Sequence, residues 1–365
     1  MGSSRYPCRM PKIQSPDDAA LAELCDRLRR STNELDVSAA WPSEQLAWCG
    51  EYGVFEWFAS REWGGQQWSE ANIVRGYLAL SGACLTTTFI ITQRTGAMQR
   101  IERSENEEAK RLLLPSLVRG STFATVGISH LTTSRRHISQ PVLRAVETNE
   151  SFVLDGYSPW VTGAAAAETV VVGATLEDQR QILIALPLTL SGVEVPAPEN
   201  LIGLTASQTG PVRCREVCVQ KKWLLAGPVH EVMKQGVGVR TGGLQTSTLA
   251  IGMAQSPIQF LESQAEQRPD LSNYASALRR EWSELRDDLL RAAENEPRCS
   301  DSEMRSRANS LVLRASQAAL AAAKGTGYVV GHPAGRWCRE ALFFLVWSCP
   351  QPVLTANLCE FTGIE

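Results

Sequence analysis

Three hydrophobic patterns follow one another along this chain, and their order limits the folds that it can adopt. In residues 17–30, apolar side chains recur every three or four positions, which is typical of a helix with one packed face. After Pro115, short runs rich in Val, Ile, Leu and Thr take over, and after Pro228 the helical spacing returns. The sequence therefore predicts a helical part, a β part and a second helical part, in that order.

The β part consists of short runs separated by turn residues such as Asn149 and Asn200. The spacing of the runs predicts a small antiparallel sandwich or barrel of about 100 residues. We place its strands within residues 123–129, 141–146, 151–156, 168–174, 181–187 and 212–220.

Helices are expected on both sides of the β part. The N-terminal helices are predicted at residues 17–30, 43–49, 71–82 and 105–114. The C-terminal helices are predicted at residues 246–261, 274–293 and 302–324. We expect these three long helices to pack antiparallel, as in a four-helix bundle. The predicted class is α+β, with an N-terminal all-α domain over 1–115, a middle β-sandwich or barrel domain over 116–226, and a C-terminal helical bundle domain over 227–365.

Composition and charge exclude several classes of function. The 36 basic and 39 acidic residues give a net charge of -3, whereas a nucleic-acid-binding protein usually carries a strongly basic face. The longest apolar stretches fall well short of the roughly 20 residues needed to span a membrane. Because the first residues lack the apolar core of a secretory signal, we expect a cytoplasmic protein. The ten cysteines are scattered and only four histidines are present, so no metal site is expected.

Several short motifs occur in one order and with one set of separations along the chain. They are REWGG at 61–65, NEEAKRLLLPSLVRG at 106–120, LDGYSPWVTGA at 154–164, KGTGY at 324–328 and GRWCREA at 335–341. Taken together, they resemble the acyl-CoA dehydrogenase family. The resemblance implies an FAD-dependent oxidoreductase, built as a homodimer or homotetramer, that acts on an acyl-CoA or acyl-carrier-protein thioester. The electron acceptor is left open by the sequence.

The resemblance also implies which residues contact the flavin. Trp160 would place an aromatic wall against the isoalloxazine ring, and Thr162 would bring a hydroxyl near its polar atoms. Ile128 and Ser129 would lie at the pyrimidine side, with Ser129 standing where the family has threonine. The rest of that family loop, which usually reads Thr-Glu-Pro and Gly-Ser-Asp, is absent here.

Other residues are expected near the ends of the ligands. Arg135 and Arg136 are candidates for contacts with the substrate or with the phosphates of its carrier, since basic pairs bind phosphate well. By the resemblance, Gly325 would approach the adenine end of the flavin, and Arg268 would be a clamp for the pyrophosphate. Trp347 is expected to contact the substrate.

The general base of the family is missing from both positions where it is found. Removing an α-proton from an acyl thioester requires a positioned base, which in most members is a glutamate. Counting forward from the motif at 335–341, that glutamate is replaced by Ser348. The second family position falls near Gly242, and no acidic residue lies between Glu231 and Glu262.

Three interpretations remain open. In the first, His130 or a thiolate at Cys349 takes the proton of an acyl thioester. In the second, the chain is a flavin-dependent monooxygenase of the same fold, for which a carboxylate base is dispensable. In the third, it is a catalytically silent homologue that binds an acyl ligand.

Overall fold

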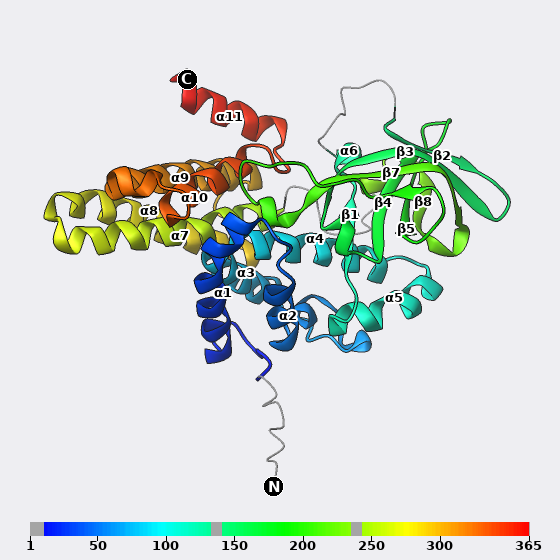
Figure 1. Cartoon of the computed structure of the whole chain (residues 1–365), viewed down its shortest axis with the longest axis horizontal. Coiled ribbons are helices and arrows are strands. Elements are labelled where there is room, and N and C mark those ends of the chain that lie inside the picture. Colours follow the sequence, from blue (N-terminus) through cyan, green and yellow to red (C-terminus); the bar gives the residue numbers. More distant parts are fainter. Residues whose placement is uncertain (1–10, 133–140, 235–242, 365) are drawn as a thin grey trace, which may run out of the picture.

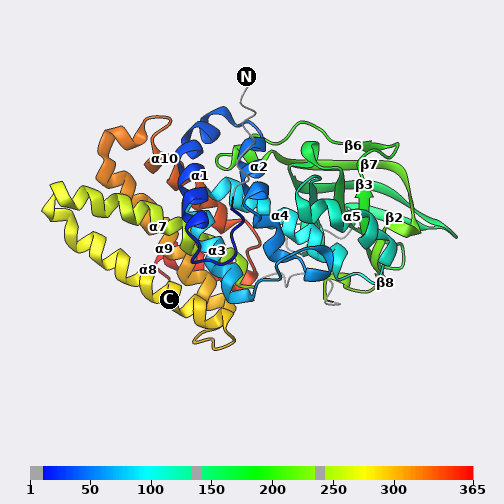
Figure 2. The ribbon, with the colours of Figure 1, turned by 90° about the horizontal axis from the view of Figure 1, so that it is seen from below.

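The computed structural model describes residues 11–132, 141–234 and 243–364. Figure 1 shows a sheet at one end of the molecule and a group of long helices at the other, with the N-terminal helices packed beneath them. The same arrangement, turned by 90°, is visible in Figure 2. The predicted order of helices, sheet and helices is confirmed. The exact domain boundaries stay a prediction.

The N-terminal helices match the predicted positions, with one addition. They are α1 (Ala19–Ser38), α2 (Ser43–Glu51), α3 (Glu70–Ala83), α4 (Leu85–Glu102) and α5 (Glu107–Arg119). The sequence analysis placed no helix over α4, which starts with three threonines and is buried over most of its length. Cys84 caps this helix, because its Sγ accepts a hydrogen bond from the backbone N–H of Thr87. A helix buried on nearly all sides lacks the one-sided spacing by which surface helices are recognised.

All six predicted strand runs contain strands, and two short strands join them in one sheet. The strands are β1 (Ala124–Gly127), β2 (Leu143–Glu147), β3 (Ser151–Thr162), β4 (Thr169–Thr175), β5 (Gln181–Pro187), β6 (Val193–Glu194), β7 (Thr209–Gln220) and β8 (Leu224–Val229). The order is β6-β7-β3-β2-β4-β5-β8, with β1 paired to β4. Most pairings are antiparallel as expected, but β1 and β2 both pair parallel to β4.

Both faces of the sheet are covered. Along β4, Val170 and Val172 point into a core that belongs to the sheet alone, and Val171 between them points into the helical core. This alternation follows from the two-residue period of a strand. The core that contains Val171 is shared by the sheet and the helices, so the sheet packs directly against the helices.

The C-terminal part follows the prediction of three long helices and adds two short ones. Its helices are α7 (Leu244–Gln267), α8 (Ser272–Ala293), α9 (Asp301–Ala323), α10 (Pro333–Leu342) and α11 (Gln351–Thr362). Helix α7 crosses α3 closely at Gly252, where an added Cβ would lie 2.0 Å from Oγ of Ser81. Ser256 secures the same crossing by donating a 2.5 Å hydrogen bond to the carbonyl of Gly82. Within the described ranges, none of the helices has the length and apolarity to cross a membrane.

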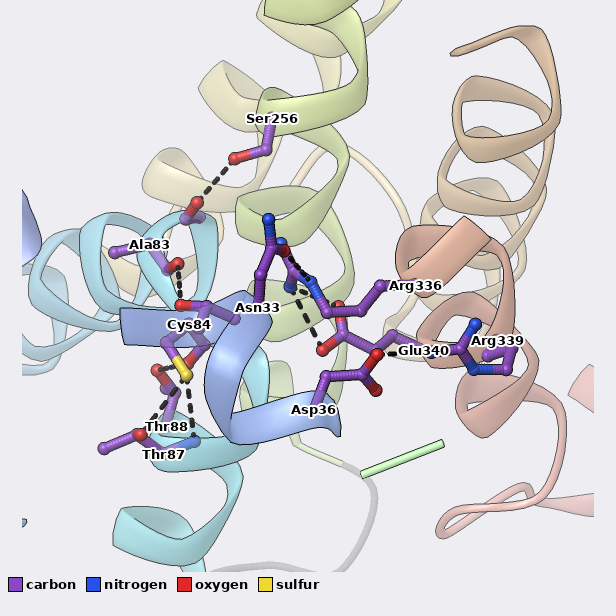
Figure 3. A network of polar contacts seen from close by, with 12 residues as sticks. Asn33, Asp36, Ala83, Cys84, Thr87, Thr88, Ser256, Arg336, Arg339 and Glu340 are labelled. Carbon is purple, nitrogen blue, oxygen red and sulfur yellow. Dashed lines mark hydrogen bonds and ion pairs between the residues drawn. The ribbon is translucent and has the colours of Figure 1, made fainter. Parts of the chain in front are cut away.

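A polar network joins α1 to α10 across the molecule (Figure 3). Arg336 donates from Nη1 to the Glu340 carboxylate at 3.1 Å and from Nε to Asn33 at 3.1 Å. Arg339 forms an ion pair with Asp36. Glu340 is 2% exposed, and its burial raises the pKa of that carboxyl. Arg336 and Arg339 thus connect α10 to Asn33 and Asp36 of α1, and the buried pair of Arg336 and Glu340 lies within α10.

Candidate functional site

A cavity of about 640 Å³ lies where three distant parts of the chain meet. One wall is a row on α4, a second comes from the sheet with the short helix α6 (Ser129–Thr132) and the loop before β7, and a third comes from α7 and the segment after α10. The α4 row is Phe89, Thr92, Gln93, Gly96 and Arg100. The sheet wall includes Val126, Ile128, Ser129, Trp160, Thr162, Leu204, Ser207 and Thr209. The third wall includes Gln245, Thr246, Arg339, Phe343, Trp347 and Ser348.

Six of the residues singled out from the sequence lie around this one cavity. They are Ile128, Ser129, Trp160, Thr162, Trp347 and Ser348. Trp160 and Thr162 lie on β3, and Ile128 and Ser129 lie where β1 leads into α6. The other two lie in the turn after α10, so distant segments of the chain face one another across the cavity. Trp160 remains 46% exposed, which leaves one side of its ring open to a ligand.

The sheet wall carries a chain of hydroxyl groups. Thr162 and Thr209 are joined by a 2.9 Å hydrogen bond, and Ser207 is joined to Thr209 at the same distance. Nearby, the buried Oγ of Ser129 has no hydrogen-bond partner among the described residues. An unpaired buried hydroxyl is costly, so Ser129 is suited to a ligand that supplies a polar atom.

Aromatic rings close the cavity between α4 and the segment after α10. Phe343 and Trp347 are stacked with their centroids 5.1 Å apart, and Phe89 meets both edge-on at 4.7 and 5.1 Å. Edge-to-face and offset contacts of this kind are favourable for aromatic rings. The cluster makes this part of the cavity apolar.

The turn that carries Ser348 is held from behind by α9. Nη2 of Arg305 donates to the carbonyls of Phe344 and Trp347 at 3.0 and 2.9 Å, and Asn309 donates to the Phe344 carbonyl at 3.1 Å. Ser348 itself has a φ of 44°, in the left-handed region. Arg305 and Ser348 also line a second, small cavity of about 20 Å³. The two α9 side chains therefore act as positioning residues for this turn.

The cavity wall contains cations but, among the described residues, no aspartate or glutamate. Arg339 is paired with Asp36, as described above. Arg100 is 4% exposed, and the one hydrogen bond that its side chain makes to a described residue runs from Nη1 to the carbonyl of Gly96 at 2.8 Å. Burial, with a smaller effect of the nearby Arg103, lowers the pKa of Arg100 to about 10. The group therefore stays charged at neutral pH.

His130 does not belong to this cavity. Its Nε2 is 2.8 Å from the carbonyl of Gly173, to which it donates in the neutral tautomer that this contact favours, and the side chain is 8% exposed. Burial lowers the pKa of His130. This placement argues against His130 as the acceptor of the substrate proton, because its Nε2 contacts a strand carbonyl, and the role of His130 stays a prediction.

Cys349 is not among the residues that line the cavity, although it follows Ser348 directly. Burial raises the pKa of its thiol, and Arg305 only partly offsets this effect. A thiol with a raised pKa is a poor source of thiolate at neutral pH. The raised pKa argues against Cys349 as the base, and its role stays a prediction.

The remaining sequence candidates lie elsewhere. Arg268 follows α7 and donates from Nη1 to the carbonyl of Ala322 at 2.7 Å. Gly325 lies in open space, with no atom within 4 Å of an added Cβ. Neither lines the cavity, and their roles toward the flavin stay predictions. Arg135, Arg136 and Gly242 fall outside the described residues.

Sequence reasoning missed the α4 row altogether. Thr92, Gly96 and Arg100 are spaced four residues apart, which places them on one helix face. That spacing was a usable signal, but the run of β-branched residues before it obscured the helix.

Replacing His130 with glutamine is expected to make the free energy of unfolding depend less on pH. Because the folded protein lowers the pKa of His130 below its ordinary value of 6.5, the unfolded chain binds the proton more readily. Stability present above pH 6.5 is therefore lost as the pH falls below it. Urea unfolding from about pH 7 to about pH 5 should show a smaller loss for His130→Gln than for the parent. An equal loss in both proteins would contradict this expectation.

The known proteins that are similar to this chain include several named acyl-CoA dehydrogenases. No family model matches the chain. It is 24% identical over 242 residues to the probable acyl-CoA dehydrogenase YngJ of Bacillus subtilis, covering 64% of this chain and 63% of that protein. It is 23% identical over 328 residues to the mitochondrial short-chain specific acyl-CoA dehydrogenase of Mus musculus, covering 84% and 79%. The match to the Bacillus protein thus spans less than two thirds of its length.

A solved structure gives the same result for the fold. The butyryl-CoA dehydrogenase of Megasphaera elsdenii superposes with a TM-score of 0.81 at 16% identity, over 94% of this chain and 96% of that one. At this level of identity, the superposition establishes the shared fold.

Proposed function

The chain belongs to the acyl-CoA dehydrogenase family, and we propose that it is an FAD-dependent oxidoreductase acting on an acyl thioester. The observation that carries this proposal is the single cavity that unites Ile128, Ser129, Trp160 and Thr162 with Ser348. The relatives are named for acyl-CoA oxidation, which supports the reaction class.

The residues around the cavity fit a flavin. The half-exposed ring of Trp160 offers a flat apolar surface, and the unpaired hydroxyl of Ser129 offers a polar contact on the same wall. The Thr162 hydroxyl is held in place by Thr209, so it is oriented before a ligand arrives. When bound, FAD would accept the hydride from the carbon β to the thioester carbonyl.

The chain's own residues set limits on the rest of the reaction. In ordinary dehydrogenation the α-proton leaves to a carboxylate, and no described residue of the cavity wall is an acid. The segments outside the described ranges contain no acid except Glu365. A serine hydroxyl without an activating partner is too weak a base at neutral pH. We therefore propose that Ser348 marks a non-standard or absent base.

The same observation favours a second candidate, a flavin-dependent monooxygenase of this fold. Such an enzyme would use a bound flavin to transfer oxygen from O₂ to its substrate, so no carboxylate would be needed for α-proton removal. A catalytically silent acyl-binding homologue is the third possibility. The choice among acyl-CoA and acyl-carrier-protein thioesters, a homodimer or homotetramer, and a cytoplasmic location all stay predictions from the sequence.

An absorption spectrum of the purified protein tests the proposal first. We expect a bound flavin, and then only slow bleaching on anaerobic addition of saturated acyl thioesters. Fast bleaching would contradict the non-standard base. A protein that remains colourless after FAD is added would contradict the flavin assignment and leave the acyl-binding homologue. Oxygenation of an added substrate after reduction with dithionite would identify the monooxygenase.

Replacing Trp160 with alanine is expected to weaken FAD binding about tenfold or more, because the variant loses the aromatic wall of the cavity. Titration of the apoprotein with FAD, followed by flavin fluorescence, measures the effect. Tyr274→Ala is the control, since Tyr274 is 66% exposed on α8 and does not line the cavity. Equal affinity of the Trp160 variant and the parent would remove this residue from the flavin site.

A further inference from the structure

Arg100 carries a buried charge that faces the cavity without a counter-ion. It lies on α4 one turn beyond Gly96, and the side chain is 4% exposed. Nη1 is used by the Gly96 carbonyl, whereas the buried Nε has no hydrogen-bond partner among the described residues. Arg100 lines the cavity, so a ligand bound there can balance its charge.

Two other buried arginines of the described chain, Arg94 and Arg336, are satisfied differently. Arg94, on the same helix, stacks on the ring of Phe55 and donates to the carbonyl of Leu117, outside the cavity. Arg336 pairs with the buried carboxylate of Glu340. Arg100 has neither arrangement. The charged group that affects its pKa is another cation, Arg103. A buried charge without a partner is strongly unfavourable, so an anion in the cavity would relieve a large cost.

That anion has to arrive with a ligand. No acid lines the cavity among the described residues, and the segments outside them contain only Glu365. A carboxylate carries the opposite charge and accepts a strong, charge-assisted hydrogen bond from a guanidinium. A phosphate of the carrier is a poorer match, since it is larger and heavily hydrated, and Arg100 is almost entirely shielded from water.

We propose that Arg100 binds a carboxylate on the acyl group, so that the preferred substrates are thioesters of dicarboxylic acids. This inference rests on the proposed function and adds the substrate class. The apolar rings of Phe89, Phe343 and Trp347 lie around the same cavity and leave Arg100 as the polar anchor within it. Recognition of one carboxylate by one arginine also rejects neutral acyl groups, because these would leave the guanidinium unpaired.

The test compares thioesters that differ only at the end of the acyl chain. Glutaryl-CoA and pentanoyl-CoA have the same number of chain carbons, and a carboxylate in the first replaces a methyl group in the second. Binding to the FAD-loaded protein is measured anaerobically by calorimetry. We expect the parent to bind glutaryl-CoA about tenfold or more tightly than pentanoyl-CoA. Arg100→Met should abolish or reverse this preference.

Arg103→Met is the matched control, since it removes the same charge from the end of the same helix but outside the cavity wall. It should keep the preference for glutaryl-CoA. FAD affinity and the flavin midpoint potential are measured for all three proteins. If Arg100→Met shifts these two values and leaves the ratio of the two thioesters unchanged, Arg100 serves the cofactor and the proposal is overturned.

Two further outcomes separate this inference from the proposed function. Equal binding of both thioesters to the parent would overturn the carboxylate site and leave the acyl-thioester function standing. A second outcome is that none of the four thioesters glutaryl-CoA, pentanoyl-CoA, succinyl-CoA and butyryl-CoA binds. This outcome would overturn the acyl-CoA function itself, and the carboxylate proposal with it.

Discussion

Replacing Ser348 with glutamate is expected to raise the rate at which a saturated acyl thioester reduces the bound flavin by about 10²–10⁴-fold, the range typical of a positioned general base. Ser348 lines the cavity, and by the sequence resemblance it replaces the glutamate of the family. A carboxylate there would lie on a turn that Arg305 and Asn309 already hold. Rapid-mixing measurement of flavin bleaching under anaerobic conditions gives the rate.

The environment of that turn favours the ionised form of an introduced carboxylate. Nε and Nη1 of Arg305 are buried without partners, and Arg305 shares a small cavity with Ser348. A positive charge nearby stabilises a carboxylate and keeps it available as a proton acceptor. Ser348→Gln is the control, because it has nearly the same size and cannot accept the proton. If glutamate and glutamine give the same rate, the missing base does not limit the reaction.

Replacing Glu340 with alanine is expected to destabilise the fold by about 3–5 kcal/mol, because it leaves Arg336 charged and unpaired in the interior. Both side chains are almost fully enclosed, at 8% and 2% exposure. The pair connects α10 to α1 through Asn33, so its loss also loosens the helix that leads into the Ser348 turn. Urea unfolding at neutral pH measures the change.

Two comparisons sharpen this test. Glu281→Ala breaks the exposed pair with Arg314 and should cost less than about 1 kcal/mol. The double variant Arg336→Met with Glu340→Leu removes both charges, and it should recover most of the stability lost in Glu340→Ala. If Glu340→Ala costs no more than Glu281→Ala, the buried pair does not hold the two helices together.

The sequence was most informative where a pattern depends on local periodicity. The runs at β4 and β5 were recognised because they are rich in β-branched and aliphatic residues and are separated by turn residues. The parallel pairing of β1 and β2 with β4 was not, since strand direction is decided by connections and packing far along the chain. Trp160, Thr162 and Ser348 were found through motifs, and the cavity confirms that they lie around one space.

The α4 row and the roles of His130 and Cys349 needed the three-dimensional structure. Cys349 was a candidate base from the sequence, yet Ser348 lines the cavity and Cys349 does not. Burial lowers the pKa of His130 and raises that of Cys349, and both shifts make the side chain a poorer base at neutral pH. Sequence alone carries no measure of burial around a single thiol or imidazole.

The cavity is assembled from walls that belong to α4, to the sheet and to the segment after α10, and this has a thermodynamic consequence. No one of these parts can form the site by itself, so a molecule bound there favours only the chain in which all three are docked. Occupancy and folding are therefore linked. A ligand present at about 100 times its Kd should add about 2.7 kcal/mol to the free energy of unfolding. In a cell, the supply of cofactor would then set how much of this protein survives degradation.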